Sequence, residues 1–110
     1  MFILNAFSIN MLPVGAAKVT FTDVTPEQAR ALAARGFDSA VGHAATAAVF
    51  SDVLGVEILM NRATVAIPAR VYGAAPWKAL VGQYSGPRLE EGATSRPEGA
   101  TIRWVTVYVD

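Results

Sequence analysis

The alternation of apolar and polar positions along the chain predicts five strands. Residues 2 to 7 form an apolar run that ends in polar side chains, as is typical of a buried strand. Residues 18 to 24 alternate polar and apolar side chains, which indicates a strand with one buried face. We expect further strands over residues 63–67, 77–84 and 102–109. The last of these is apolar and aromatic on both faces, which favours a position inside the sheet.

A first helix is expected between the second and third of these strands. Thr25 and Gln28 have the spacing of a capping box, in which each side chain accepts a hydrogen bond from the other residue's backbone N–H. Pro26 suits the first helical position, and Gly36 ends the Ala- and Arg-rich run that follows. The pattern therefore predicts a helix that begins at Pro26 and ends at Gly36.

A second helix is expected to begin near Asp38 or Ser39 and to end at Gly55. Ser39 is the better cap, so the unpaired N–H groups of the first turn are expected over residues 40–42. Together these elements predict an α+β domain, with a mixed central sheet of about five strands and two helices packed on it.

Composition limits the number of domains and the available chemistry. The 110 residues suffice for one hydrophobic core, so we expect a single domain over residues 1–110. The absence of cysteine excludes disulfides, thiolate metal sites and cysteine nucleophiles. Nine positive side chains balance nine negative ones, which argues against a protein that grips DNA through many phosphates.

The apolar content predicts an assembly of two copies. Apolar residues make up 53% of the chain, and its mean hydropathy is +0.36. So short a chain is expected to cover part of this apolar surface with a second copy of itself, which makes a homodimer the expected state.

Neither apolar segment of the chain is typical of a targeting or membrane segment. No cation precedes Lys18, so the N-terminal run lacks the charged start of a secretory signal. Residues 44–60 contain Asp52, Gly55 and Glu57, which are incompatible with a bilayer span. We therefore expect a soluble, cytoplasmic protein with no membrane partner.

The single histidine is the first candidate for chemistry. His43 directly follows Gly42 near the expected helix start, where free N–H groups and the helix dipole favour an anion and glycine lets it approach. From there His43 could donate a proton to an oxygen that leaves a bound phosphate. The alternative is a histidine at a helix start with no further role.

Three short polar side chains follow the first predicted strand. Asn5, Ser8 and Asn10 lie where that strand ends, a common place for ligand sites, and could hydrogen-bond a sugar or a phosphate. The alternative is local, because Asn and Ser favour turns through hydrogen bonds to their own backbone.

Other polar residues suit an anion pocket less specifically. Arg62 and Arg88 lie beside turns and carry the planar fork that matches phosphate oxygens. Glu91 could orient a nucleophile, or it could form an exposed ion pair with Arg88. Thr46 lies one helical turn after His43 and could touch the same ligand, or it could be a half-buried helix residue.

The chain lacks the motifs of metal and nucleotide cofactor sites. One histidine with scattered acids offers neither paired zinc ligands nor a dense carboxylate cluster. A P-loop, a Rossmann glycine fingerprint and a nucleophile elbow are also absent. The residues alone therefore predict a small α+β protein with an anion pocket and no metal or cofactor.

Three stretches in combination resemble a known family, the viral anti-CRISPR ring nucleases of type III systems, which also have cellular members. The first stretch is LNAFSINML, the second is built around SAVGH, and the third is RLEEG. In this sequence they are residues 4–12; residues 39–43 with Thr46, 54–56 and 61–62; and residues 88–92.

This resemblance implies a homodimer that binds cyclic tetra-adenylate, a second messenger of type III CRISPR systems, and cuts it to linear di-adenylate products. By the same resemblance His43 is the general acid and Glu91 assists; Glu90 is the alternative carboxylate, and Glu91 is favoured because it precedes Gly92. Destroying the messenger would switch off the ancillary effector nucleases. The implied pocket residues are Asn5, Ser8, Asn10, Gly42, Thr46, Arg62, Gln83 and Arg88.

RNA carries its own nucleophile, so such an enzyme need only align a ribose 2′-hydroxyl with the adjacent phosphorus and protonate the departing oxygen. Two other interpretations remain. A binding module could sequester the cyclic oligoadenylate in the same pocket without cutting it, in which case His43 would be dispensable. The second of these interpretations is a viral structural or nucleic-acid-binding dimer, which the zero net charge supports poorly.

Overall fold

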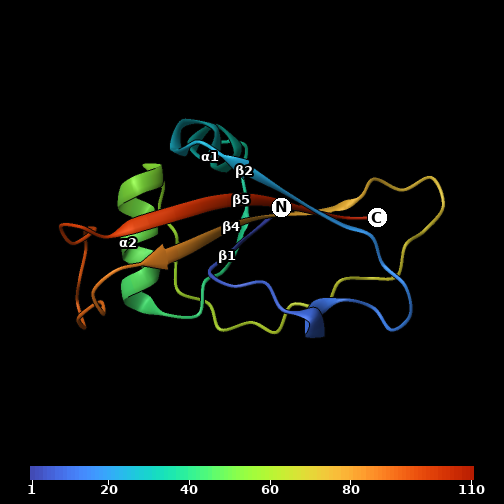
Figure 1. Ribbon diagram of the computed structural model, residues 1–110, viewed down its shortest axis with the longest axis horizontal. Helices are drawn as coiled ribbons and strands as arrows, with labels where there is room; N and C mark the ends of the chain where they lie inside the picture. The colour runs from blue at the N-terminus through green and yellow to red at the C-terminus, as the bar shows by residue number, and fades with distance from the viewer.

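A five-stranded mixed sheet with two helices forms the protein (Figure 1). The computed structural model describes all 110 residues. Its elements are β1 (Phe2–Leu4), the 3-10 helix η1 (Ile9–Met11), β2 (Val19–Val24), α1 (Pro26–Ala33), β3 (Asp38–Ala40), α2 (Ala44–Leu54), β4 (Trp77–Ser85) and β5 (Thr101–Val109). The strands lie in the order β2-β5-β4-β1-β3. The α+β class and the mixed sheet are therefore as predicted.

Strand directions decide which ends of the strands meet. Strand β1 is parallel to both β3 and β4, whereas β5 is antiparallel to β4 and β2. The carboxyl ends of β1, β3 and β4 therefore open at the same end of the sheet. Figure 1 shows α2 and the loop from β4 to β5 at this end, and the loops around residues 12–18 and 68–76 at the other.

The start of α1 forms as the sequence predicts. The Thr25 hydroxyl accepts from the Gln28 backbone N–H at 3.1 Å, and the Thr25 N–H donates to Gln28 Oε1 at 2.9 Å. This capping box and Pro26 in the first turn fix where the helix begins. The helix ends at Ala33, and Gly36 follows with a φ of 101°.

The predicted start of the second helix is wrong. Residues Asp38 to Ala40 form β3, because their backbone pairs with β1. Ser39 caps no helix: its hydroxyl donates to the Leu59 carbonyl at 2.6 Å. The helix α2 begins at Ala44, so His43 is its N-cap residue and the first turn lies four residues later than predicted.

Two strand predictions also need correction. Residues 63–67 form no strand; they cross the sheet face as coil, and Val65 and Ile67 are buried there, which explains the alternation in the sequence. The first strand ends at Leu4 rather than at residue 7, because Asn5 leaves the sheet to bind another loop.

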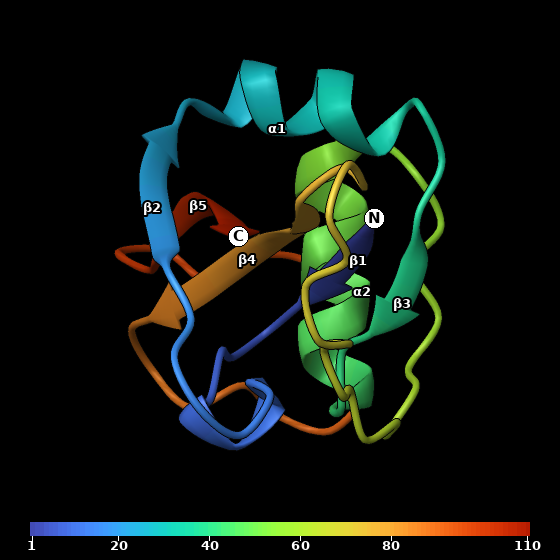
Figure 2. The ribbon, with the colours of Figure 1, turned by 90° about the vertical axis from the view of Figure 1, so that its right-hand side faces the viewer.

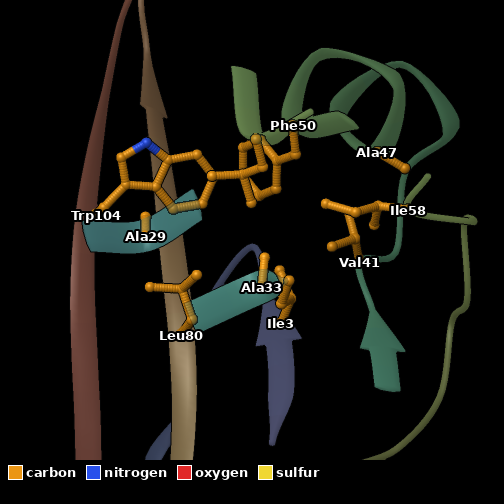
Figure 3. Packing of buried hydrophobic residues seen from close by; sticks show 10 residues of the cluster. Ile3, Ala29, Ala33, Val41, Ala47, Phe50, Ile58, Leu80 and Trp104 are labelled. Carbon is orange, nitrogen blue, oxygen red and sulfur yellow. The ribbon is translucent and has the colours of Figure 1, made fainter. Parts of the chain in front are cut away.

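The two faces of the sheet are covered differently. Both helices pack on one face, where α1 spans the space between β2 and β3 (Figure 2). Phe50 of α2 meets Trp104 of β5 there, with ring centroids 4.9 Å apart (Figure 3). The other face is covered by coil and carries a second cluster of buried residues. Its members are Leu4, Val65, Ile67, Ala79, Val81, Val107 and Val109.

Candidate functional site

The candidate site lies where β1 and β3 end. Asn5 follows β1 directly, and residues 41–43 connect β3 to α2. Because the two strands are parallel and adjacent, these segments leave the sheet side by side. The topology thus brings together residues that are far apart in the sequence, as is common at the carboxyl ends of parallel strands.

Two side chains hold the peptide groups of Gly42 from different segments. Asn5 Oδ1 accepts a hydrogen bond from the Gly42 N–H at 3.2 Å. Arg62 Nε donates to the Gly42 carbonyl at 2.8 Å. The Arg62 terminal nitrogens have no partner within the protein, so they remain free for an anion. Gly42 is therefore fixed on both sides, and with it the position of His43.

His43 is exposed and its imidazole makes no hydrogen bond. Its backbone is extended, with φ −131° and ψ 132°, and its carbonyl accepts the first helical bond from Ala47 at 2.9 Å. The N–H groups of residues 44–46 have no partner, and no acidic residue lies in this turn. The half-buried Thr46 belongs to the same turn. These groups form an electropositive helix end beside an imidazole that is free to react.

Gly42 is not required by its own surroundings. Its φ is not in the left-handed region, and a Cβ there would meet only Arg62 Cγ, at an ordinary 3.6 Å. An alanine would therefore fit the protein. Because glycine carries no Cβ and only Arg62 Cγ lies within 4 Å of that position, a ligand can approach this backbone more closely than it could beside a larger residue.

Ser8 and Asn10 serve a local structure. The Ser8 hydroxyl accepts from the Asn10 N–H at 3.2 Å and caps η1, which is the local alternative for these residues. Coil on the sheet face ties this turn in place, because the Ile67 N–H donates to the Met11 carbonyl at 2.8 Å. Neither side chain is hydrogen-bonded to the residues around Gly42.

Arg88 and Glu91 lie on the loop from β4 to β5. Both are exposed, and they line a shallow hollow of about 420 Å³ with Leu89 and Glu90. They form no ion pair with each other, so that alternative is wrong: the ion pairs of the protein are Arg30–Glu27, Arg70–Asp110 and Arg103–Asp23. The loop leaves the same end of the sheet as His43, but neither residue is bonded to the Gly42 cluster.

Gln83 lies in a separate hollow on the sheet face that carries no helix, which we call the sheet-face hollow. Its volume is about 490 Å³, and it shares Asn5 with the site around Gly42. Its lining residues are Asn5, Ala6, Phe7, Phe21, Val81, Gln83, Arg103, Val105 and Val107.

Sequence reasoning missed Arg103 at the rim of this hollow. Its guanidinium binds Asp23 on both oxygens, with Nε–Oδ1 at 2.6 Å and Nη2–Oδ2 at 3.0 Å. These hydrogen bonds hold the pKa of the Asp23 carboxyl below its ordinary value, because they stabilise the charged form. No sequence signal identified it, because Arg103 of β5 lies opposite Gln83 of β4 only through the strand register of the folded sheet.

No group of three or more His, Asp or Glu side chains converges as a metal site would require. No helix has the length and apolar character needed to cross a bilayer. The groups around Gly42 therefore comprise one imidazole, free backbone N–H groups, a guanidinium and a neutral amide.

Comparison with known proteins gives matches over nearly the whole chain. The family model described as STIV B116-like matches residues 1–103, which include every residue predicted for the site. Ten chains of solved structures match as well. One is B116 of Sulfolobus turreted icosahedral virus (STIV), with a TM-score of 0.76 and 26% sequence identity, covering 97% of this chain and 97% of that chain. Among curated proteins, none matches.

Proposed function

The chain belongs to the STIV B116-like family, and from this premise we propose that it is a metal-independent ring nuclease. In this proposal a homodimer binds cyclic tetra-adenylate at its subunit interface and cleaves it to linear di-adenylate products. Loss of the ring would switch off the ancillary effectors of a type III CRISPR system. The observation that carries the proposal is His43, an exposed imidazole without a partner at the start of α2.

The reaction needs little from the protein beyond alignment and one proton. The ribose 2′-oxygen attacks the adjacent phosphorus, a new P–O bond forms, and the bond from phosphorus to the 5′-oxygen breaks. His43 donates a proton to that leaving 5′-oxygen, and the proton of the 2′-hydroxyl passes to solvent. A positioned general acid contributes about 100- to 10,000-fold, and alignment of the two reacting groups contributes further.

Charge on the phosphoryl oxygens needs donors that are already in place. The free N–H groups of residues 44–46 and the terminal nitrogens of Arg62 point to this role, because both lie beside His43 and lack partners. The hydrogen bonds from Asn5 and Arg62 keep the Gly42 peptide in one orientation. The N-cap position of His43 is thus preorganised for an anion.

Glu91 and Arg88 complete the proposed site from another segment. Within one protomer they are bonded to none of the groups around Gly42. Their roles, with Glu91 orienting the 2′-hydroxyl and Arg88 binding phosphate, therefore require the ligand or the second protomer to bring this loop to His43. A two-fold dimer suits a four-nucleotide ring, since each His43 would then act on one of two opposite phosphates.

The decisive experiment incubates the purified protein with cyclic tetra-adenylate in the presence of a chelator and separates the products by chromatography. We expect linear di-adenylate from the wild type. His43→Ala should bind the ring but cut it about 100- to 10,000-fold more slowly. Thr64→Ala, an exposed position on the coil after Arg62, serves as the matched control and should cut at the wild-type rate.

The other outcomes are equally informative. An intact ring after prolonged incubation with the wild type, together with tight binding, would establish sequestration instead of catalysis. Undiminished cutting by His43→Ala would remove this residue as the general acid. Failure of the wild type to bind the ring at all would exclude both interpretations.

A further inference from the structure

The sheet face without helices is covered unevenly. Ala79 and Val107 are fully buried there. Phe21 of β2, which pairs with Val107 of β5, is 59% exposed. Val105, the next residue on this face of β5, is half-buried. The sheet-face hollow occupies this open part, and its volume of about 490 Å³ falls in the range of about 300–1,000 Å³ that small-molecule sites occupy.

Two aromatic rings stand at the hollow and come from different segments. Phe7 belongs to the loop after β1, and Phe21 belongs to β2. Their rings meet edge to face, with centroids 5.7 Å apart and planes at 84°. Phe7 thus supports Phe21 from one side while Phe21 stays more than half exposed. Every nucleobase has a π-face that can stack on such a ring.

The rim of the hollow is polar. The exposed Gln83 amide makes no hydrogen bond within the protein, so it can both donate and accept. This donor and acceptor pair matches the N6 and N7 groups of adenine. Arg103, held by Asp23 on both oxygens, adds a flat and fixed guanidinium. An exposed ion pair and a free amide beside exposed aromatic surface suit a base with a polar edge better than an aliphatic ligand.

Asn5 connects this hollow to the site around Gly42. It lines the hollow, and its Oδ1 accepts the Gly42 N–H, one residue before His43. A nucleotide whose base entered the hollow would therefore have its sugar and phosphate close to the start of α2.

From this combination we infer that the sheet-face hollow is a subsite for an adenine base, in which the base stacks on Phe21 and Gln83 reads its polar edge. The inference rests on the proposed function for the choice of an adenine nucleotide. Stacking on Phe21 and contacts from Gln83 would supply adenine selectivity, whereas the helix N–H groups, the Arg62 guanidinium and the His43 imidazole suit phosphate.

The first test maps binding directly, without any reaction. Adenosine 5′-monophosphate and cytidine 5′-monophosphate are titrated separately into ¹³C-methyl-labelled protein. We expect the adenine nucleotide to shift the methyl signals of Val81, Val105 and Val107 more strongly than the cytosine nucleotide. The methyls of Val14 and Val71, at the other end of the sheet, should not move. Unmoved signals in the hollow would overturn the subsite, whether or not the protein cuts a ring.

The second test uses variants in a His43→Ala background, so that the ring stays intact while its affinity is measured. Phe21→Leu keeps apolar cover but removes the ring face, and should weaken binding of cyclic tetra-adenylate about tenfold or more, whereas Phe21→Trp should restore it. Tyr72→Ala, a fully exposed aromatic far from the hollow, is the control and should bind as its parent does. Thermal unfolding of each variant verifies that it folds.

The third test concerns the edge of the base. Gln83→Ala should reduce the preference for adenine over guanine mononucleotides about tenfold and leave stability unchanged.

Equal affinities for Phe21→Leu and its parent would overturn the subsite while the proposed nuclease stands. Dissociation of a dimer by Phe21→Leu, with unchanged affinity for the ring, would show that Phe21 contacts the second protomer and not a base, and would overturn the subsite together with the location of the ring at the subunit interface. A wild type that responds to adenosine 5′-monophosphate in the hollow but never cuts the ring would remove the nuclease and keep the subsite.

Discussion

Gly42 and Gly82 are both glycines, but they differ in how much room their surroundings leave for a side chain. At Gly82, in the middle of β4, an added Cβ would lie 2.5 Å from the Trp104 ring and 2.6 Å from the Phe50 ring. At Gly42 it would meet a single atom, Arg62 Cγ, at 3.6 Å. The core therefore demands glycine at Gly82 so that two aromatic side chains can pack against the strand. At Gly42 the protein would tolerate a Cβ, so packing within the protomer does not explain why glycine stands there.

Gly82 is needed for packing of the core, whereas Gly42 belongs to the candidate site. A glycine inside a strand usually weakens it, since it contributes no side chain to packing. Here β4 runs unbroken from Trp77 to Ser85, because the Phe50–Trp104 pair fills the space above Gly82. Around Gly42, Asn5 and Arg62 bind its N–H and carbonyl, and Arg62 Cγ alone lies within 4 Å of the position that a Cβ would take.

The largest effect is expected from Gly82→Ala. The new methyl group would overlap the Phe50 and Trp104 rings, and overpacking of this kind costs about 1–3 kcal/mol of stability. Urea unfolding followed by tryptophan fluorescence measures the loss. Combining Gly82→Ala with Phe50→Leu should destabilise less than the sum of the two single changes, because the smaller side chain makes room. A strictly additive result would show that the overlap is relieved elsewhere.

A smaller effect with a different readout is expected from Gly42→Ala, the matched substitution. Its free energy of unfolding should stay within about 0.5 kcal/mol of the wild type, since the methyl group meets only an ordinary contact. Affinity for cyclic tetra-adenylate should fall about tenfold, because the methyl group occupies the path to the backbone. Loss of stability without loss of affinity would reverse the comparison between the two glycines.

The smallest effect is expected from Asp23→Asn, which touches neither glycine. The hydrogen bonds from Arg103 lower the Asp23 pKa from its ordinary 3.8, so the stabilisation by this exposed pair is complete above that value. It is lost as the pH falls through the lowered pKa in the folded state. The stability difference between wild type and Asp23→Asn should therefore be small at neutral pH and vanish in strong acid, as urea unfolding across pH would measure. A difference that grows toward acid would contradict the assigned sign.

Sequence reasoning succeeded where local signals are complete. The capping box of Thr25 and Gln28, and the long strands β4 and β5, could be located to within a residue or two. It failed at β3 and at residues 63–67, for one reason. The three residues of β3 are a strand because β1 lies beside them, and residues 63–67 alternate because the sheet lies beneath them.

For the candidate site too, some properties follow from the sequence and others from the tertiary structure. The sequence by itself determined the chemistry: one imidazole next to a glycine, no thiol, balanced charge and a helix close by. Only the tertiary structure decided that Asn5 and Arg62 hold Gly42, that His43 is the N-cap residue, and that Gln83 shares a hollow with Phe21 and Arg103. Capping depends on residues that are close together in the sequence, so the sequence alone can predict it. Which distant segments meet depends on strand order and register, and these are set by burial of the whole sheet.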